Sequence, residues 1–190
     1  VLADAFGRMG VEMPTPLRRM NYWDAMDTYG SDKPDTRYGM HLVDLTDIFA
    51  NSKFKVFATA ANEEGSVVKA INAKGAGAWA RAKIDKLAGV ASTFGAKGLA
   101  WARMLDGKVT SSYQKFLPDE ENAAILERAG AKDGDLILIV GDVKDEVVFA
   151  SLGALRIECA KQLGILDPND FKFLWVTEFP MFEWSEEEGR

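Results

Sequence analysis

An unbroken apolar run, Leu136 to Val140, lies between an Asp-Gly turn at residues 133–134 and Gly141. A short apolar run that is bounded by turn residues is typical of a strand buried in a sheet. A long helix-forming stretch follows at residues 146–163, and Gly164 stands where such a helix would end. The two segments together predict a domain in which helices cover a sheet.

Further elements are predicted along the rest of the chain from apolar periodicity and turn residues. We expect helices at residues 3–9, 22–29, 42–49, 78–94 and 118–128, and strands at 53–60, 66–71, 99–104, near 109 and at 173–176. Residues 62–65 are expected to form a hairpin turn. Two hairpin-like pairs, each followed by a helix, predict an α+β fold in which helices cover one face of a single sheet.

The counts of ionisable residues exclude several classes of site. The only cysteine is Cys159 and the only histidine is His41, which excludes an internal disulfide and metal centres built from several cysteines or histidines. The net charge is −6, with 29 acidic and 23 basic residues, and this argues against a chain whose main task is gripping a nucleic-acid backbone. Residues 178–190 carry −4 of that charge, so the remainder is close to neutral.

The sequence predicts neither a membrane span nor a secretory signal at its start. No window approaches the ~18 consecutive apolar residues of a membrane span. The first eight residues lack the charged and apolar regions of a secretory signal. Because the chain starts without methionine and inside a predicted helix, we expect it to be a fragment of a longer protein.

Several short motifs have a functional and a structural interpretation. Gly95-Ala-Lys-Gly98 has too few residues between its glycines for a phosphate loop, so a helix-to-strand turn is preferred. Asp142, Asp145 and Glu146 could bind Mg²⁺, but stabilisation of the next helix start is simpler. We expect His41 to be a partly buried structural residue and Cys159 an inert core thiol.

Two sets of polar residues have two interpretations each, as a solvated surface or as part of a binding site. Arg81, Lys83 and Lys86 share the helix predicted at 78–94, and Lys97 follows it, so one face could contact RNA phosphates. From the residues alone a solvated helix face is preferred. The loop Ser31-Asp32-Lys33-Pro34-Asp35-Thr36-Arg37 is either a charged turn or an ion-pair network near a site.

The same loop carries a resemblance to a known family. Tyr29-Gly-Ser-Asp-Lys-Pro-Asp-Thr-Arg-Tyr-Gly-Met40 resembles the segment after motif 2 of bacterial-type aspartyl-tRNA synthetases. Residues 95–101, 153–156, 174–183 and 186–190 resemble later segments of the same family, in the same order. The resemblance therefore covers nearly the whole chain, and the Ser-Asp-Lys-Pro-Asp segment is its most specific part.

The resemblance implies a division of the chain and a fold. Residues 42–170 would be an insertion (GAD) domain, a two-layer α/β sandwich whose antiparallel sheet is covered by helices. Residues 1–41 and 171–190 would be pieces of the class II catalytic core. The parent enzyme would use ATP and Mg²⁺ to activate aspartate and would transfer it to tRNA-Asp. It would be a cytoplasmic homodimer with no membrane attachment.

The chain lacks the sequence motifs that form the active site in this family. It lacks the motif 2 arginine segment and the Gly-rich motif 3, so no catalytic residue, metal ligand or cofactor site is assigned to it. We expect the isolated chain to show no ATP–pyrophosphate exchange. The resemblance puts Ser31, Asp32 and Lys33 near the active site or the tRNA acceptor end, and it makes the tRNA backbone the partner of Arg81, Lys83, Lys86 and Lys97. The alternatives are an RNA-linked module like that of the tRNA amidotransferase B subunit, or a protein interaction domain.

Overall fold

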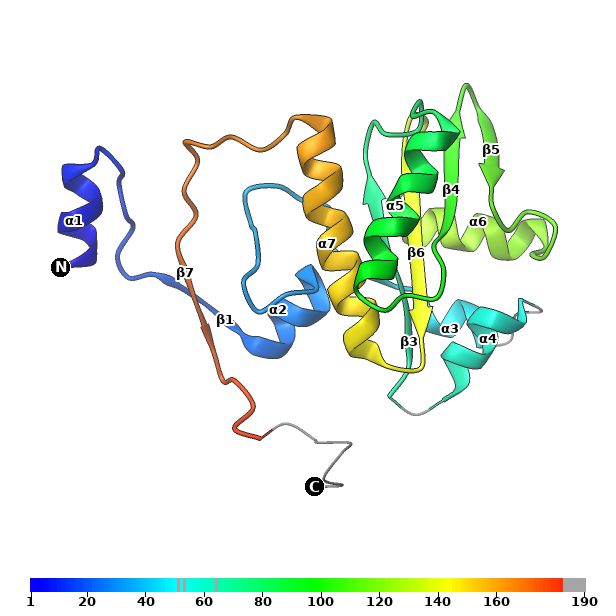
Figure 1. Ribbon diagram of the computed structural model, residues 1–190, viewed down its shortest axis with the longest axis horizontal. Coiled ribbons are helices and arrows are strands. Elements are labelled where there is room, and N and C mark those ends of the chain that lie inside the picture. Colours follow the sequence, from blue (N-terminus) through cyan, green and yellow to red (C-terminus); the bar gives the residue numbers. More distant parts are fainter. Residues whose placement is uncertain (51, 53, 64, 183–190) are drawn as a thin grey trace.

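The computed structural model describes residues 1–50, 52, 54–63 and 65–182, which contain a two-stranded and a five-stranded sheet (Figure 1). The larger sheet is antiparallel in the order β2-β3-β6-β4-β5. Its strands are β2 (Val43–Asp44), β3 (Val67–Ala73), β4 (Ala100–Leu105), β5 (Lys108–Ser111) and β6 (Leu136–Asp142). The smaller sheet pairs β1 (Arg18–Asn21) with β7 (Leu174–Thr177) in parallel.

Seven helices are described around these strands. They are α1 (Leu2–Arg8), α2 (Tyr22–Tyr29), α3 (Thr46–Phe49), α4 (Lys55–Asn62), α5 (Arg81–Thr93), α6 (Asp119–Arg128) and α7 (Asp145–Leu163). The start of α2 is stabilised by Asn21, whose side-chain oxygen accepts the backbone N–H of Trp23 at 2.8 Å. Within the described residues, no helix is both long enough and apolar enough to cross a membrane.

Strand β6 lies in the middle of the larger sheet, as its unbroken apolar run predicts. It pairs with β3 on one side and β4 on the other, and the side chains of residues 136–140 are fully buried. Because successive side chains of a strand point to opposite faces, Leu136, Leu138 and Val140 enter one apolar cluster, and Ile137 and Ile139 enter another. The strand therefore needs an apolar layer on each face of the sheet.

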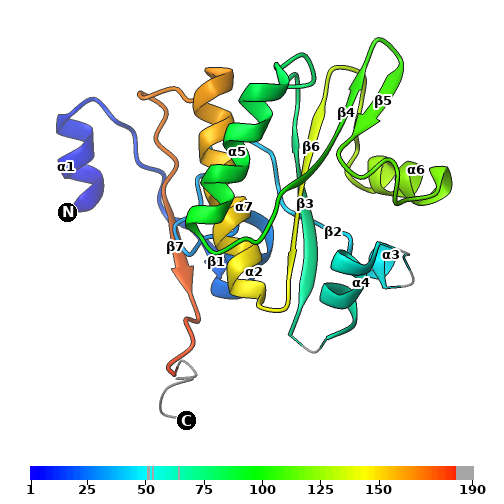
Figure 2. The ribbon, with the colours of Figure 1, turned by 45° about the vertical axis from the view of Figure 1, so that its right-hand side comes forward.

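Helices supply both of these layers. Figure 2 shows α5 and α7 on one face of the sheet and α3, α4 and α6 on the other. The mixed α and β fold with an antiparallel sheet is confirmed, but the prediction that helices cover one face only is wrong. The continuous apolar run of β6 is the physical reason, since it leaves no polar face to turn toward water.

Two local predictions are also wrong. The segment 53–60 was predicted to be a strand in a hairpin with 66–71, but α4 covers Lys55–Asn62, and Lys53 lies outside the described residues. The segment 42–49 forms the short strand β2 and the short helix α3 in place of one helix. Phe54 and Phe57 are three residues apart, a spacing that suits a helix, and such short apolar runs fit both periodicities. Residues 186–190, one of the segments that carry the family resemblance, lie outside the described residues.

Candidate functional site

The end of α2 packs directly against the middle of α7, and we call this contact the α2–α7 joint (Gly30, Gly153, Arg156 and the loop 31–40). Gly30 ends α2 in the left-handed conformation, with a φ of 68°. A Cβ atom on Gly153 would lie 2.5 Å from the carbonyl oxygen of Gly30, closer than real Cβ contacts. The two backbones can therefore meet only because both positions are glycine.

Arg156 anchors the loop that follows α2. Its side chain is fully buried, its Nε donates to the carbonyl oxygen of Met40 at 2.7 Å, and its Nη2 donates to those of Gly39 at 3.0 Å and Asp35 at 3.2 Å. The guanidinium also lies 4.9 Å from the ring centre of Tyr29 and 4.8 Å from that of Tyr38. One residue of α7 thus fixes both ends of the segment 35–40.

The polar loop itself is held by pairs of residues that are close in the sequence. Ser31 Oγ accepts the backbone N–H of Lys33 at 3.1 Å, and the ammonium of Lys33 pairs with Asp32 at 2.9 Å. Arg37 forms a bidentate pair with Asp35, and its hydrogen bond holds the pKa of that carboxyl below the usual value. The loop therefore contains local ion pairs, which fit both a charged turn and a network near a site, while the side chain of Lys33 stays 85% exposed.

A second contact links α2 to the larger sheet through a buried lysine. Lys69 lies on β3 with a side chain that is 2% exposed, and its ammonium pairs with Asp27 of α2 at 2.6 Å. Asp44 of β2 is a weaker second partner at 3.4 Å. A buried cation depends on such partners, because its transfer from water is costly. Sequence reasoning missed Lys69 and noted Arg156 only as the end of the resembling segment 153–156, without a role; the available signal was a basic residue inside an apolar segment.

His41 lies beside the joint, where its ring packs edge-on against Tyr29 with the ring centres 5.2 Å apart. Desolvation by the surrounding side chains lowers its pKa below the usual 6.5, and the nearby cations Arg156, Arg18 and Lys74 add to this. The structural interpretation of His41 fits this environment.

His41→Gln is expected to reduce the loss of stability at mildly acidic pH. In the native protein the stabilising contribution of neutral His41 is complete above pH 6.5 and is lost as the pH falls through its lower folded pKa. Urea unfolding at pH 7.5, 6.5 and 5.5 measures this dependence. A variant that loses stability as steeply as the unchanged chain would contradict the assignment.

The predicted basic residues do not form one cluster. Arg81, Lys83 and Lys86 lie on α5, but Lys97 follows the opposite end of that helix, about 18 Å along its axis at 1.5 Å per residue. Lys97 pairs with Asp142 at 3.5 Å. The expected grouping of four is therefore divided into a triplet at one end of α5 and a single lysine at the other.

Two tryptophans support the cations at the first end of α5. The guanidinium of Arg81 lies 4.7 Å from the ring centre of Trp101, and the ammonium of Lys83 lies 3.7 Å from that of Trp79. Arg103 of β4, which the sequence reasoning missed, joins them by donating to the carbonyl oxygen of Trp79 at 3.3 Å. We call Arg81, Lys83, Lys86 and Arg103 the basic edge. Asp85 pairs with Arg81 at 2.7 Å, and this carboxylate reduces the net positive charge of the basic edge.

Of the remaining candidates, Asp142 does not lie at the start of α7 as expected, because it ends β6 and pairs with Lys97. Residues 95–98 form the turn between α5 and β4, and Asp145 and Glu146 lie in the first turn of α7. Cys159 is fully buried, which raises the pKa of its thiol to about 12. Within the described part of the chain, no three His, Cys, Asp or Glu residues are grouped so that they could hold a metal ion.

Comparison with known proteins gives the family. A family model described as the GAD domain matches residues 57–151, which is half of the chain. The chain belongs to the GAD domain family. The matched region runs from α4 into α7, so it contains the basic edge, β3, β4, β5 and β6. It stops short of Arg156 and of the segments that form the smaller sheet.

Relatives extend the likeness beyond the GAD domain. An aspartate–tRNA ligase of Ruminiclostridium cellulolyticum is 51% identical over 96% of this chain and 30% of the relative. That of Clostridium botulinum is 50% identical over the whole chain and 32% of the relative. An aspartate–tRNA(Asp/Asn) ligase of Thermoanaerobacter is 46% identical over 96% of the chain and 30% of the relative. The resemblance indicated by the motifs is confirmed, and the chain spans about a third of the length of these relatives.

Proposed function

We propose that this chain is the GAD-containing segment of an aspartate–tRNA ligase and that it does no chemistry itself. Its work is to brace the neighbouring catalytic core and to contact the acceptor side of tRNA-Asp. The α2–α7 joint carries this proposal, because Arg156 of α7 binds three carbonyl groups of the segment 35–40. That segment adjoins the motif most specific to the synthetases.

The division of the chain follows from the same proposal. Residues 1–41 and 171–190 would belong to the catalytic core and residues 42–170 to the insertion. The parallel pairing of β1 with β7 supports this division, since it joins the two flanking segments into a sheet of their own. Ser31, Asp32 and Lys33 would then lie near the active site or the acceptor end, with the exposed ammonium of Lys33 directed to solvent.

The parent enzyme would supply what this chain lacks. ATP and Mg²⁺ would bind to motifs that are not found in this sequence, and the chain would have no cofactor of its own. The similarity to aspartate–tRNA ligases supports tRNA-Asp as the nucleic-acid partner. A homodimeric, cytoplasmic parent is part of the same proposal.

The basic edge is the surface proposed for contact with the tRNA backbone. Lys83 is held against Trp79 and Arg81 against Trp101, so these cations present their charge at defined positions with less side-chain entropy to lose on binding. Lys86 is exposed on the same helix. Lys97 would make a separate contact at the other end of α5.

A double charge reversal, Lys83→Glu with Lys86→Glu, is expected to weaken binding of a tRNA-Asp transcript by at least about tenfold at low salt. The slope of the logarithm of the binding constant against the logarithm of the salt concentration should also become less steep by about two, because each lost phosphate contact removes nearly one unit of that slope. Fluorescence anisotropy at several salt concentrations measures both quantities.

A control of equal charge is available in Lys115→Glu with Lys132→Glu. Both residues are exposed and lie outside α5 and β4. If this control weakens binding as much as the first pair, net charge rather than the basic edge explains the effect. If the variant with Lys83→Glu and Lys86→Glu binds the transcript as tightly as the unchanged chain, the basic edge does not contact tRNA.

A further inference from the structure

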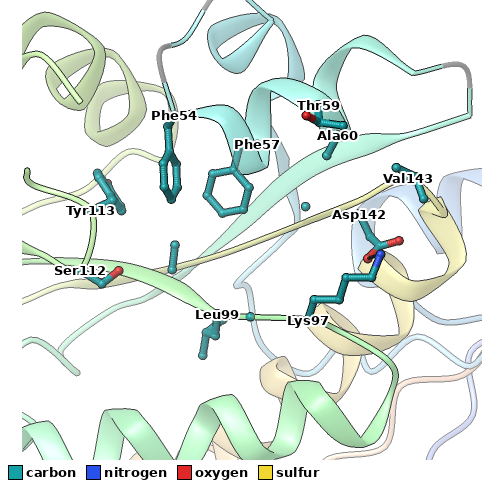
Figure 3. A pocket seen from close by; sticks show the side chains of 13 residues that line it. Phe54, Phe57, Thr59, Ala60, Lys97, Leu99, Ser112, Tyr113, Asp142 and Val143 are labelled. Carbon is teal, nitrogen blue, oxygen red and sulfur yellow. Dashed lines mark ion pairs between the residues drawn. The ribbon is translucent and has the colours of Figure 1, made fainter. Parts of the chain in front are cut away.

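A cavity of about 510 Å³ opens within the GAD domain, on the face of the sheet that α4 covers (Figure 3). Its lining comes from α4, from the turn before β4, from the residues after β5 and from the end of β6. This volume lies in the range of pockets that hold small organic ligands, and such pockets are mostly apolar with a few polar groups. The cavity takes no part in the α2–α7 joint or the basic edge.

Aromatic rings form one part of the wall. Phe54, which directly precedes α4, and Phe57 of α4 meet edge to face with ring centres 5.0 Å apart, and Tyr113 also lines the cavity. Phe57 also packs against β6 at Gly141, where an added Cβ would lie only 2.9 Å from its ring. Phe57 and Tyr113 are only 4% and 1% exposed, and Phe54 stacks on Phe116, so Phe54 offers most of the aromatic surface that is left for a ligand to pack on.

An ion pair lies at the other end of the cavity. Figure 3 shows the side chain of Lys97 extended toward Asp142, and the two charged groups are 3.5 Å apart. The Asp142 side chain is 6% exposed and accepts the backbone N–H of Lys144 at 3.2 Å, so it is fixed in place. The Lys97 side chain is 79% exposed. Its ammonium is therefore free to turn toward an anion in the cavity.

We propose that this cavity binds a small planar aromatic carboxylate, with its ring against Phe54, Phe57 and Tyr113 and its carboxylate on Lys97. A single negative charge fits better than a phosphate dianion, because the fixed carboxylate of Asp142 lies beside the same ammonium. This site is independent of the basic edge, which lies on the opposite face of the sheet, but it shares Lys97 with the separate tRNA contact proposed above.

The site can be tested with 2-naphthoate and its uncharged analogue 2-naphthol. Binding to the chain is followed by nuclear magnetic resonance, with the backbone amides of Gly98 and Gly141 as reporters because both residues line the cavity. We expect saturable shifts of these amides with 2-naphthoate. Lys97→Gln should weaken 2-naphthoate about tenfold and leave 2-naphthol unchanged. Thr59→Trp, at an exposed position of α4 that lines the cavity, should weaken both compounds at least tenfold.

The control is Lys86→Gln, an exposed lysine of α5 that does not line the cavity. It removes the same charge and should leave the affinity for 2-naphthoate unchanged. Absence of saturable shifts at Gly98 and Gly141 would overturn the proposal. The proposal would also be overturned if Lys86→Gln and Lys97→Gln weakened the binding of 2-naphthoate equally. The effect would then come from the net charge of the protein and not from the position of Lys97 in the cavity.

Discussion

Arg156→Ala is expected to lower the free energy of unfolding by about 3 kcal/mol, the largest effect predicted for a single residue of this chain. The substitution removes the donors of three hydrogen bonds to Asp35, Gly39 and Met40. It also leaves a void between Tyr29 and Tyr38, whose rings flank the guanidinium. Urea unfolding followed by tryptophan fluorescence measures the loss.

Two further variants separate the role of Arg156 from charge alone. Arg156→Lys keeps a cation but not the planar fork, so we expect it to recover only part of the lost stability. Arg128→Ala serves as the matched control, because Arg128 lies at the end of α6 and pairs with Asp47 at the surface. Its loss should be far smaller. Equal losses at the two arginines would show that burial of Arg156 has no special importance.

Gly153→Ala is expected to lower the free energy of unfolding by about 2 kcal/mol, although alanine is favoured over glycine inside a helix by about 1 kcal/mol. The new methyl group would lie 2.5 Å from the carbonyl oxygen of Gly30 and 3.4 Å from that of Tyr29. Both are backbone atoms, so α2 and α7 would have to separate. Thermal unfolding of the variant measures the cost.

The chain provides a matched control in α5. Gly89 is also inside a helix, but a Cβ atom there would meet nothing within 4 Å. Gly89→Ala should therefore raise the free energy of unfolding by about 1 kcal/mol. Stabilisation by both substitutions would contradict the close packing of α2 on α7.

The elements that could be predicted from sequence are those whose pattern admits one interpretation. The run at 136–140 and the helix ending at Gly164 are of this kind, and both are confirmed. The segment 53–60 is not, because alternation and helical spacing both fit its apolar residues. Only the position of Phe57 and Ala60 against the sheet favours the helix, and that contact is tertiary.

The candidate site was harder to predict than the fold. The motif at 29–40 led to the correct family, but nothing in it indicates that Arg156, more than a hundred residues later, holds its backbone. The length of α5 separates Lys97 from Arg81, and the idea of one basic face did not take that length into account. Arg103 was missed because β4 brings it beside α5 only through the sheet.

The ion pairs of the buried Lys69 ammonium limit how far the chain can be shortened without loss of stability. Its strongest partner, Asp27, lies outside the region that the family model matches, as does Asp44. A piece trimmed to residues 57–151 would keep a cation inside the sheet without either carboxylate, and it would also lose the second half of α7. We therefore expect the smallest autonomous unit to be wider than the family match and to include α2, although α2 lies in the segment proposed for the catalytic core.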